Sequence, residues 1–206
     1  MSIRFQSVGY GHIAGLSINK ERGVFSQPRQ RITIGATGIQ GDIYNSPWRT
    51  LGPHDGNYIA TDGLSVGDIV RNHRQITILD INEINQANKM LRYKVVQTMA
   101  RENILIETQF LLDGLFFSKL PPMSRMVIGD KSKKVLNLTE ENVPCRTMAR
   151  PIANYYARMH RNLNKDTFAE EIVTALTNRR GQMAEVKTEK TTQVREGDRF
   201  QIFLPM

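Results

Sequence analysis

The sequence has very little cysteine, because only one of its 206 residues, Cys145, is a cysteine. A single thiol excludes an internal disulfide and any metal site built from several cysteines. Long hydrophobic runs are also absent, since no apolar stretch approaches the roughly 18–20 residues that cross a membrane. The first residues lack the apolar core of a secretion signal. These absences predict a cytoplasmic protein without membrane segments, in which any cysteine chemistry depends on Cys145.

The sequence also lacks the usual spacings of catalytic and metal sites. Its four histidines show no metal-ligand spacing. Gly9, Gly11 and Gly15 lack the strand and helix that flank a nucleotide-binding glycine loop. The adjacent pairs Glu140–Glu141 and Glu170–Glu171 are expected to be exposed helix or turn residues rather than a facing acid and base.

Positive charge is in surplus, with 28 Lys and Arg against 20 Asp and Glu, a net charge of +8. The basic residues fall in small separate groups instead of clustering on one element, so nucleic acid is not an expected partner. We expect the surplus to solvate the surface and to supply a few anion contacts. The alternative reading is a pocket for a phosphate-bearing small molecule.

Glycine and aspartate frequently stand side by side in the chain, since seven of the nine aspartates adjoin a glycine. Such pairs form turns, and short β-branched runs lie between them, at 69–70, 76–79, 104–106, 126–128, 135–138 and 200–204. Short strands separated by turns predict a mainly β barrel or sandwich. No linker, repeat or low-complexity segment divides the chain, so we expect one domain over residues 1–206.

Helical patterns are confined to two places. Asn82 is expected to cap a short helix. Between residues 149 and 181, Pro151 suits the first turn of one helix, and Thr167 with Glu170 suits a capping box at the start of another. Gly181 is expected to stop that second helix. The pair predicts a helical insertion around 150–180 that lies on the barrel.

The segment before Cys145 is stiffened by Pro144, which fixes its own backbone and extends the residue before it. Arg146 and a nearby helix start would favour the thiolate of Cys145. A thiolate is both a nucleophile toward sulfur and a soft metal ligand. The alternative reading is a free cysteine that packs as an inert small hydrophobe.

Six segments in chain order resemble the MOSC domain, the module found at the C-terminus of molybdenum cofactor sulfurases and as free-standing small bacterial proteins. The segments are 38–44 (GIQGDIY), 74–79 (RQITIL), 101–104 (RENI), 120–129 (LPPMSRMVIG), 141–145 (ENVPC) and 180–186 (RGQMAEV), followed by the hairpin at 194–202. Ile43 and Tyr44 stand where the family often has Arg or Leu and then His. The resemblance implies a distorted, Greek-key-like β-barrel with a few helices.

The family is associated with the pterin of molybdenum cofactor, and its cysteine is regarded as a sulfane-sulfur carrier or as the ligand to molybdenum. The resemblance therefore makes Cys145 the candidate catalytic residue and molybdenum ligand. Candidate cofactor-binding residues that match the family's pattern are Asp42, Arg74, Asn103, Arg180 and Gly181. The two arginines suit a phosphate, whereas Asp42 and Gly181 can also be explained as turn formers and Asn103 as a partner of buried backbone.

Three functions follow from these expectations. The first is a molybdenum cofactor-binding or sulfur-carrier protein that receives sulfur from a donor protein or small ligand through Cys145. The second is a molybdenum-dependent reductase of N-hydroxylated compounds, which needs a separate electron-donor protein. The third is a non-catalytic binding module with a basic surface. Pyridoxal phosphate is not expected, because it belongs to the separate desulfurase domain of the larger sulfurases.

Overall fold

The computed structural model of the chain describes residues 3–21, 24–52, 63–129 and 133–206. In this part of the chain 38% of residues lie in strands and 20% in helices, and seven strands close into a β-barrel. His54 and the turn aspartates Asp55, Asp62 and Asp130 lie outside the described residues. Within the described residues, no helix has the length and hydrophobicity needed to cross a membrane.

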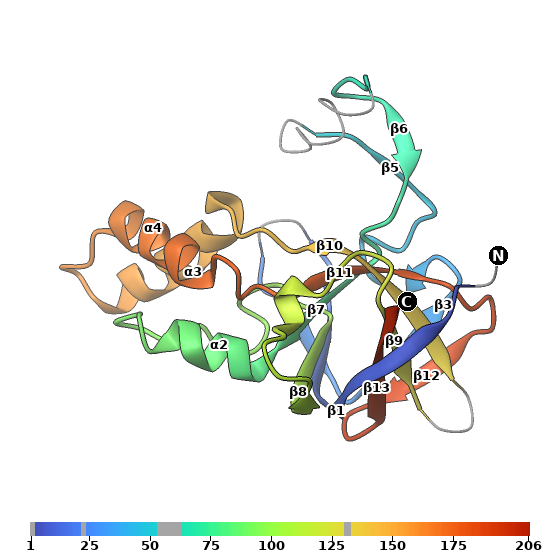
Figure 1. Ribbon diagram of the computed structural model, residues 1–206. Helices are drawn as coiled ribbons and strands as arrows, with labels where there is room; N and C mark the ends of the chain where they lie inside the picture. Colours follow the sequence, from blue (N-terminus) through green and yellow to red (C-terminus); the bar gives the residue numbers. More distant parts are fainter. Residues whose placement is uncertain (1–2, 22–23, 53–62, 130–132) are drawn as a thin grey trace.

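The barrel has the strand order β13-β9-β10-β11-β7-β8-β1, and β1 closes it by pairing with β13 (Figure 1). These strands are β1 (Phe5–Ile18), β7 (Ile76–Asp80), β8 (Ile104–Leu111), β9 (Arg125–Ile128), β10 (Lys134–Glu141), β11 (Gln182–Val186) and β13 (Arg199–Pro205). Only β7 and β8 pair in parallel among these described strands. The predicted mainly β barrel is confirmed.

The smaller strands surround this barrel. β2 (Gln27–Arg29) extends the sheet beside β1, while β3 (Arg31–Gly35), β4 (Gly38–Ile39) and β12 (Thr192–Arg195) form a second sheet. β5 (Trp48–Thr50) pairs with β6 (Ile69–Arg71) in an arm that projects from the barrel (Figure 1). The short 3-10 helix η1 covers Phe117–Lys119.

The longest strand, β1, was not predicted, because its three glycines argue against a strand on propensity alone. Its ladders with β13 and β8 shift register beside Gly9, Gly11 and Gly15. A Cβ at Gly11 would overlap the Glu107 carbonyl oxygen, and one at Gly15 would overlap the Gln97 amide. Glycine is therefore present because neighbouring groups approach the strand closely at its bulges.

Three helices lie together on one side of the barrel (Figure 1). They are α2 (Ile81–Asn88), α3 (Arg146–Met159) and α4 (Lys165–Leu176). α3 and α4 pack against each other and share with α2 a hydrophobic core distinct from the barrel interior. Ile152, Phe168 and Ile172 are fully buried in that core. The helical insertion expected around 150–180 is thus the second layer of the molecule.

The predicted helix ends were wrong in detail. Asp80, not Asn82, caps α2, and its carboxylate accepts a hydrogen bond from the Asn82 backbone. Asn164 caps α4, three residues before Thr167, where the predicted capping box began. Helix α4 ends at Leu176, and Asn178 adopts the left-handed conformation (φ 62°) that commonly follows a helix. Pro151 lies inside α3 rather than in its first turn.

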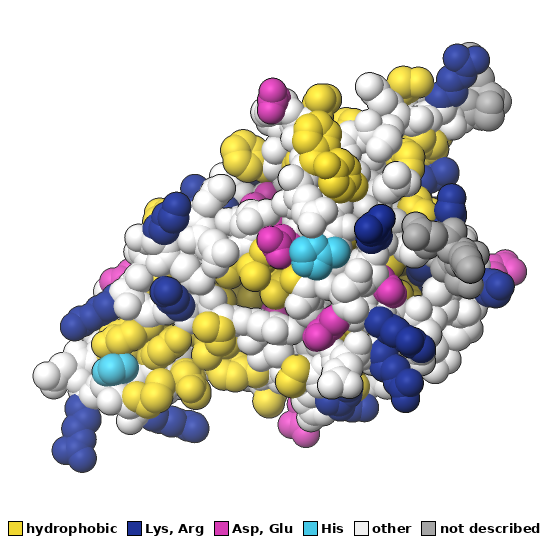
Figure 2. Space-filling model, turned by 90° about the horizontal axis from the view of Figure 1, so that it is seen from below, with side chains coloured by type: hydrophobic (Ala, Val, Ile, Leu, Met, Phe, Trp, Pro, Cys, Tyr) yellow, Lys and Arg dark blue, Asp and Glu magenta, His cyan; other side chains and the backbone are white. Residues whose placement is uncertain are grey.

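The charged surface agrees with the pattern seen in the sequence. Figure 2 shows Lys and Arg side chains in small separate groups on one face, with hydrophobic side chains gathered at the helical end. Glu170 and Glu171 are exposed on α4 as expected. Glu140 and Glu141, in contrast, are half-buried residues of β10 and form ion pairs with Arg74 and Lys119.

Candidate functional site

Cys145 lies where the barrel meets the helical layer, between the end of β10 and the start of α3. It is the N-cap residue of α3, and its carbonyl oxygen accepts hydrogen bonds from the Met148 and Ala149 backbones, both at 3.1 Å. Its side chain makes no capping hydrogen bond, and the thiol is exposed. Cys145 is therefore not packed in the interior, and the positive end of a 14-residue helix lies at its backbone.

Arg180 is held beside this segment by strand pairing. β11 runs antiparallel to β10, and the Asn142 backbone donates to the Gly181 carbonyl at 3.0 Å. The Arg180 guanidinium then reaches the chain just before the cysteine, where its Nη1 donates to the Val143 carbonyl at 2.8 Å. Arg180 thus fixes the backbone of the Val143–Cys145 segment.

Arg180 is a buried cation without a matching carboxylate hydrogen bond. The residue is 9% exposed, its Nη2 donates at 3.5 Å to the Ala100 carbonyl, and its Nε has no partner among the described residues. Burial lowers the pKa of Arg180 to about 10, while attraction to Cys145 opposes that shift. Arg180 therefore stays protonated near neutral pH and places a positive charge near the sulfur.

Gly181 is explained by packing. Its φ of +72° is one that side-chain-bearing residues rarely adopt, and a Cβ there would overlap the Ile78 carbonyl oxygen. The glycine lets the start of β11 lie directly against β7. Gly181 therefore affects the site through its backbone conformation, which positions the adjacent residue Arg180.

A tight turn at residues 98–102 forms the other side of the site. Thr98 (φ 75°) and Arg101 (φ 61°) both adopt left-handed backbone, which costs free energy for residues other than glycine. The carboxylate of the buried Glu102 accepts a hydrogen bond from the Thr98 backbone and stabilises the turn. Burial raises the pKa of Glu102 to about 7, against the attraction of Arg180.

Arg101 and Tyr44 join this cluster, although neither was a sequence candidate. The Arg101 Nη2 lies 3.5 Å from the Tyr44 hydroxyl and 3.0 Å from the Glu21 carbonyl, and its buried Nε has no partner among the described residues. Both residues also act electrostatically on Arg180. Both residues lie inside segments that resemble the family, 38–44 and 101–104, and this position could have marked them as site residues. The left-handed backbone of Arg101 and its contact with Tyr44 could not be predicted from the sequence.

Asp42 and Asn103 form a buried network that ties the turn to the barrel. The Asp42 carboxylate accepts from the Asn103 amide at 2.7 Å and from the Asn19 backbone at 2.7 Å, and its other oxygen accepts from the Tyr44 backbone at 2.9 Å. The Asn103 carbonyl accepts from the Thr77 backbone at 3.0 Å. Both side chains are therefore occupied by the protein itself, and they position Tyr44 and Arg101.

Arg74 belongs to a different set of contacts. Its guanidinium forms an ion pair with Glu140 on β10, with Nη2 and Oε2 3.1 Å apart, and its backbone donates to Asn72. The structure thus brings Asp42, Asn103, Arg180 and Gly181 into one connected region near Cys145. Arg74 instead contacts Glu140 near the end of β10, a strand that is paired on both sides within the barrel.

No metal cage of ordinary type is present in the described ranges, because no three His, Cys, Asp or Glu side chains gather there. The arrangement near Cys145 is instead one exposed sulfur, two arginines with unpartnered Nε atoms and a polar turn. Such a site can hold an anionic molecule and present a sulfur atom to it.

Comparison with known proteins matches this fold. A family model described as the MOSC domain matches residues 48–201, a range that includes every candidate site residue except Asp42. The solved structure of the YuaD protein from Bacillus subtilis resembles this chain with a TM-score of 0.77 and 20% identity, over 98% of each chain. YiiM from Geobacillus stearothermophilus resembles it with a TM-score of 0.51 and 11% identity, over 97% of this chain and 75% of its own. A search of the curated proteins finds no match.

Proposed function

Because the chain belongs to the MOSC domain family, which is generally associated with molybdenum cofactor binding, we propose that it binds this cofactor through Cys145 and Arg180. The observation that carries the proposal is the buried Arg180 beside an exposed cysteine. Its unpartnered Nε is a donor that the protein leaves unused. A buried donor without an acceptor is rare and suits a ligand anion.

The residues present fit the group. Molybdenum cofactor carries a phosphate, which suits the guanidinium groups of Arg180 and Arg101 because each has an unpartnered Nε. The Cys145 sulfur is a soft ligand of the kind that binds such metals. When bound, the cofactor supplies a redox-active metal centre. The chain itself contributes the Cys145 sulfur, the positive potential around that sulfur, and the rigid Val143–Cys145 backbone that orients it.

Each residue has a separate role in this site. Arg180 orients the Val143–Cys145 backbone through the Val143 carbonyl and binds the ligand's anionic group. Arg101 and Tyr44 form the adjoining rim, held by the Asp42 network. Asp42 and Asn103 are positioning residues, and Arg74, which forms an ion pair with Glu140 on β10, is proposed as a further cofactor-binding residue.

We also propose that Cys145 can carry a sulfane sulfur atom. A Cys145 thiolate can attack the sulfane sulfur of a donor persulfide, so that a new S–S bond forms at Cys145. The donor's S–S bond breaks and the donor leaves as its thiolate. The Cys145 hydropersulfide that results loses its proton to solvent, and the positive charge of Arg180 stabilises the persulfide anion. We expect this chemistry in the cytoplasm and with a separate donor protein.

Arg180→Gln tests the proposal. It removes the guanidinium and its buried charge while keeping a polar amide on a shorter side chain, so we expect the content of molybdenum and pterin in the purified protein to fall at least about tenfold. Arg179→Gln is the matched control, because the neighbouring Arg179 donates hydrogen bonds to the Ala175 and Thr177 carbonyls at the end of α4. Equal cofactor content in all three proteins, each with an unchanged circular dichroism spectrum, would refute the role of Arg180.

A further inference from the structure

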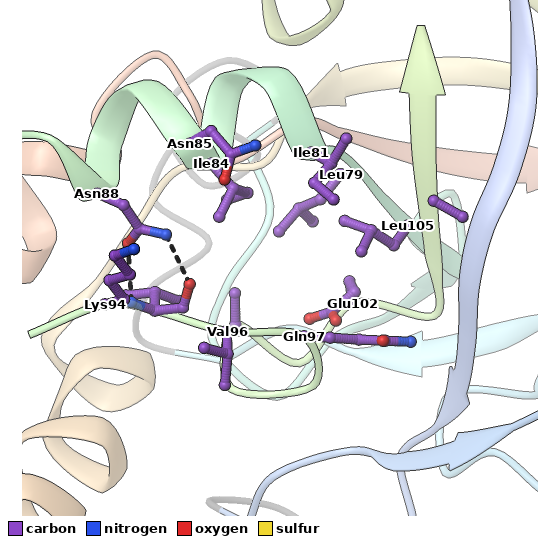
Figure 3. Close-up of a pocket in the computed structure, with 13 residues that line it drawn as sticks. Leu79, Ile81, Ile84, Asn85, Asn88, Lys94, Val96, Gln97, Glu102 and Leu105 are labelled. Carbon is purple, nitrogen blue, oxygen red and sulfur yellow. Dashed lines mark hydrogen bonds between the residues drawn. The ribbon is translucent and has the colours of Figure 1, made fainter.

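A cavity that Cys145 does not line lies between helix α2, the start of β8 and the segment 94–102 (Figure 3). Its volume is about 280 Å³. Pockets for drug-sized ligands measure roughly 300–1,000 Å³. The cavity therefore suits a molecule of fragment size.

Most of the cavity wall is apolar. Leu79, Ile84 and Leu105 come from β7, α2 and β8 and are themselves buried. The Asn88 amide, at one end, is already used, because it exchanges two hydrogen bonds with the Val95 backbone at 2.8 and 2.9 Å (Figure 3). An apolar body can therefore pack in the cavity without displacing hydrogen bonds of the wall.

Glu102 is the acidic residue of the wall, whose other polar lining residues are Asn85, Asn88, Lys94 and Gln97. It is 2% exposed, and its Oε2 accepts no hydrogen bond from any residue that the structure describes. Figure 3 shows its carboxylate turned toward the space enclosed by Val96 and Leu105. A buried carboxylate oxygen without a donor is costly, so a donor from a bound molecule would remove that cost.

The charges around the cavity decide between ligand classes. Arg180 attracts Glu102 from the side of the Cys145 site. Lys94 lies at the opposite end of the cavity, beside Asn88 (Figure 3). The Glu102 carboxylate would repel an anionic ligand. A neutral ligand could donate only an uncharged hydrogen bond, which is weaker than one from a cation. A cationic donor satisfies Oε2 best.

We propose that this cavity binds a compact organic amine, whose apolar body packs on Leu79, Ile84 and Leu105 and whose ammonium group donates to Glu102 Oε2. This site is additional to the proposed cofactor site and does not depend on it. The cavity recognises its ligand through the Glu102 carboxylate and through its small apolar volume.

Three isosteric probes test the charge preference: benzylamine, benzyl alcohol and benzoate, titrated by calorimetry at about pH 8, above the Glu102 pKa of about 7. We expect benzylamine to bind at least about tenfold more tightly than benzyl alcohol, because its hydrogen bond is charge-assisted. Benzoate is expected to bind more weakly than either. If the Cys145→Ser variant binds the three probes with the same order of affinities, binding in this cavity is independent of the cofactor site.

Two variants locate the binding. Glu102→Gln keeps an acceptor for the Thr98 backbone and is expected to abolish the preference for the amine, whereas Glu107→Gln, which alters an exposed carboxyl on β8, should keep it. Ile84→Phe reduces the cavity volume and should weaken binding of both benzylamine and benzyl alcohol. Absence of benzylamine binding, equal binding of amine and alcohol, tighter binding of benzoate, or a preference that survives Glu102→Gln would each overturn the proposal.

Discussion

At the scale of single residues, the candidate site depends on how Arg180 is buried. Among the described residues it donates hydrogen bonds to the backbone carbonyls of Val143 and Ala100, so its charge is not neutralised by a bonded carboxylate. Glu102 lies near enough to attract it, yet burial keeps the pKa of that acid at about 7. The positive charge is therefore available to an anion bound beside Cys145.

Gly181 gives a prediction at this scale. Gly181→Ala should lower the free energy of unfolding by at least about 3 kcal/mol, because it adds both a left-handed backbone cost and an overlap with the Ile78 carbonyl. Gly197→Ala is the control, since Gly197 has a similar φ of +86° but open space around its Cα. It should cost about 1–2 kcal/mol. Urea denaturation measures both, and equal losses would show that packing at Gly181 does not matter.

The sequence predicted Cys145 and Arg180 because each lies in a recognisable segment. It did not predict Arg101, Glu102 or Tyr44 as site residues. Their importance comes from a left-handed backbone, from complete burial and from contacts between residues more than fifty positions apart. None of these properties is visible in local sequence patterns.

At the scale of elements, apolar and β-branched runs predicted the barrel strands well. β1 was missed because its glycines are required by bulges and close neighbours, which only the assembled sheet reveals. Helix ends were misplaced for a similar reason. Several Ser, Thr, Asn and Asp residues near each start are competent caps, and tertiary packing selects among them.

Helix α4 provides a direct test of the corrected cap. Asn164→Ala should destabilise the protein by about 1 kcal/mol, because the Asn164 side chain accepts from the backbones of Asp166 and Thr167. Thr167→Ala should change the stability by less than about 0.5 kcal/mol, since Thr167 is exposed and is not the cap. Thermal denaturation of the two variants distinguishes them. The reverse order would restore Thr167 as the helix start.

At the scale of the whole molecule, a barrel and a helical layer meet around two buried acids. Glu102 lies beneath the candidate site, and Glu83 faces the η1 helix, where the Ser118 backbone donates to it at 3.0 Å. Burial raises the pKa of each to about 7 from 4.5. Each folded-state carboxyl therefore holds its proton more tightly than the unfolded chain does.

This raised pKa predicts how stability depends on pH. Between about pH 4.5 and 7 the folded state binds more protons than the unfolded state, so the free energy of unfolding should fall as the pH rises. Each acid contributes up to about 3 kcal/mol to that fall. Glu102→Gln and Glu83→Gln should each flatten the curve, whereas Glu107→Gln on the surface should not. A curve that rises over this range and is unchanged in both variants would contradict the assignment.

The central claim, that Cys145 is the sulfur through which the protein binds its cofactor, is tested most directly by one measurement. Molybdenum content and intact mass are determined together on freshly purified wild-type protein and on Cys145→Ser. We expect bound molybdenum, or an adduct of about 32 Da from one sulfur atom, in the wild type. We expect neither in the variant, which should keep its fold because the Cys145 side chain makes no capping bond. Equal molybdenum or an equal adduct in both proteins would contradict the central claim.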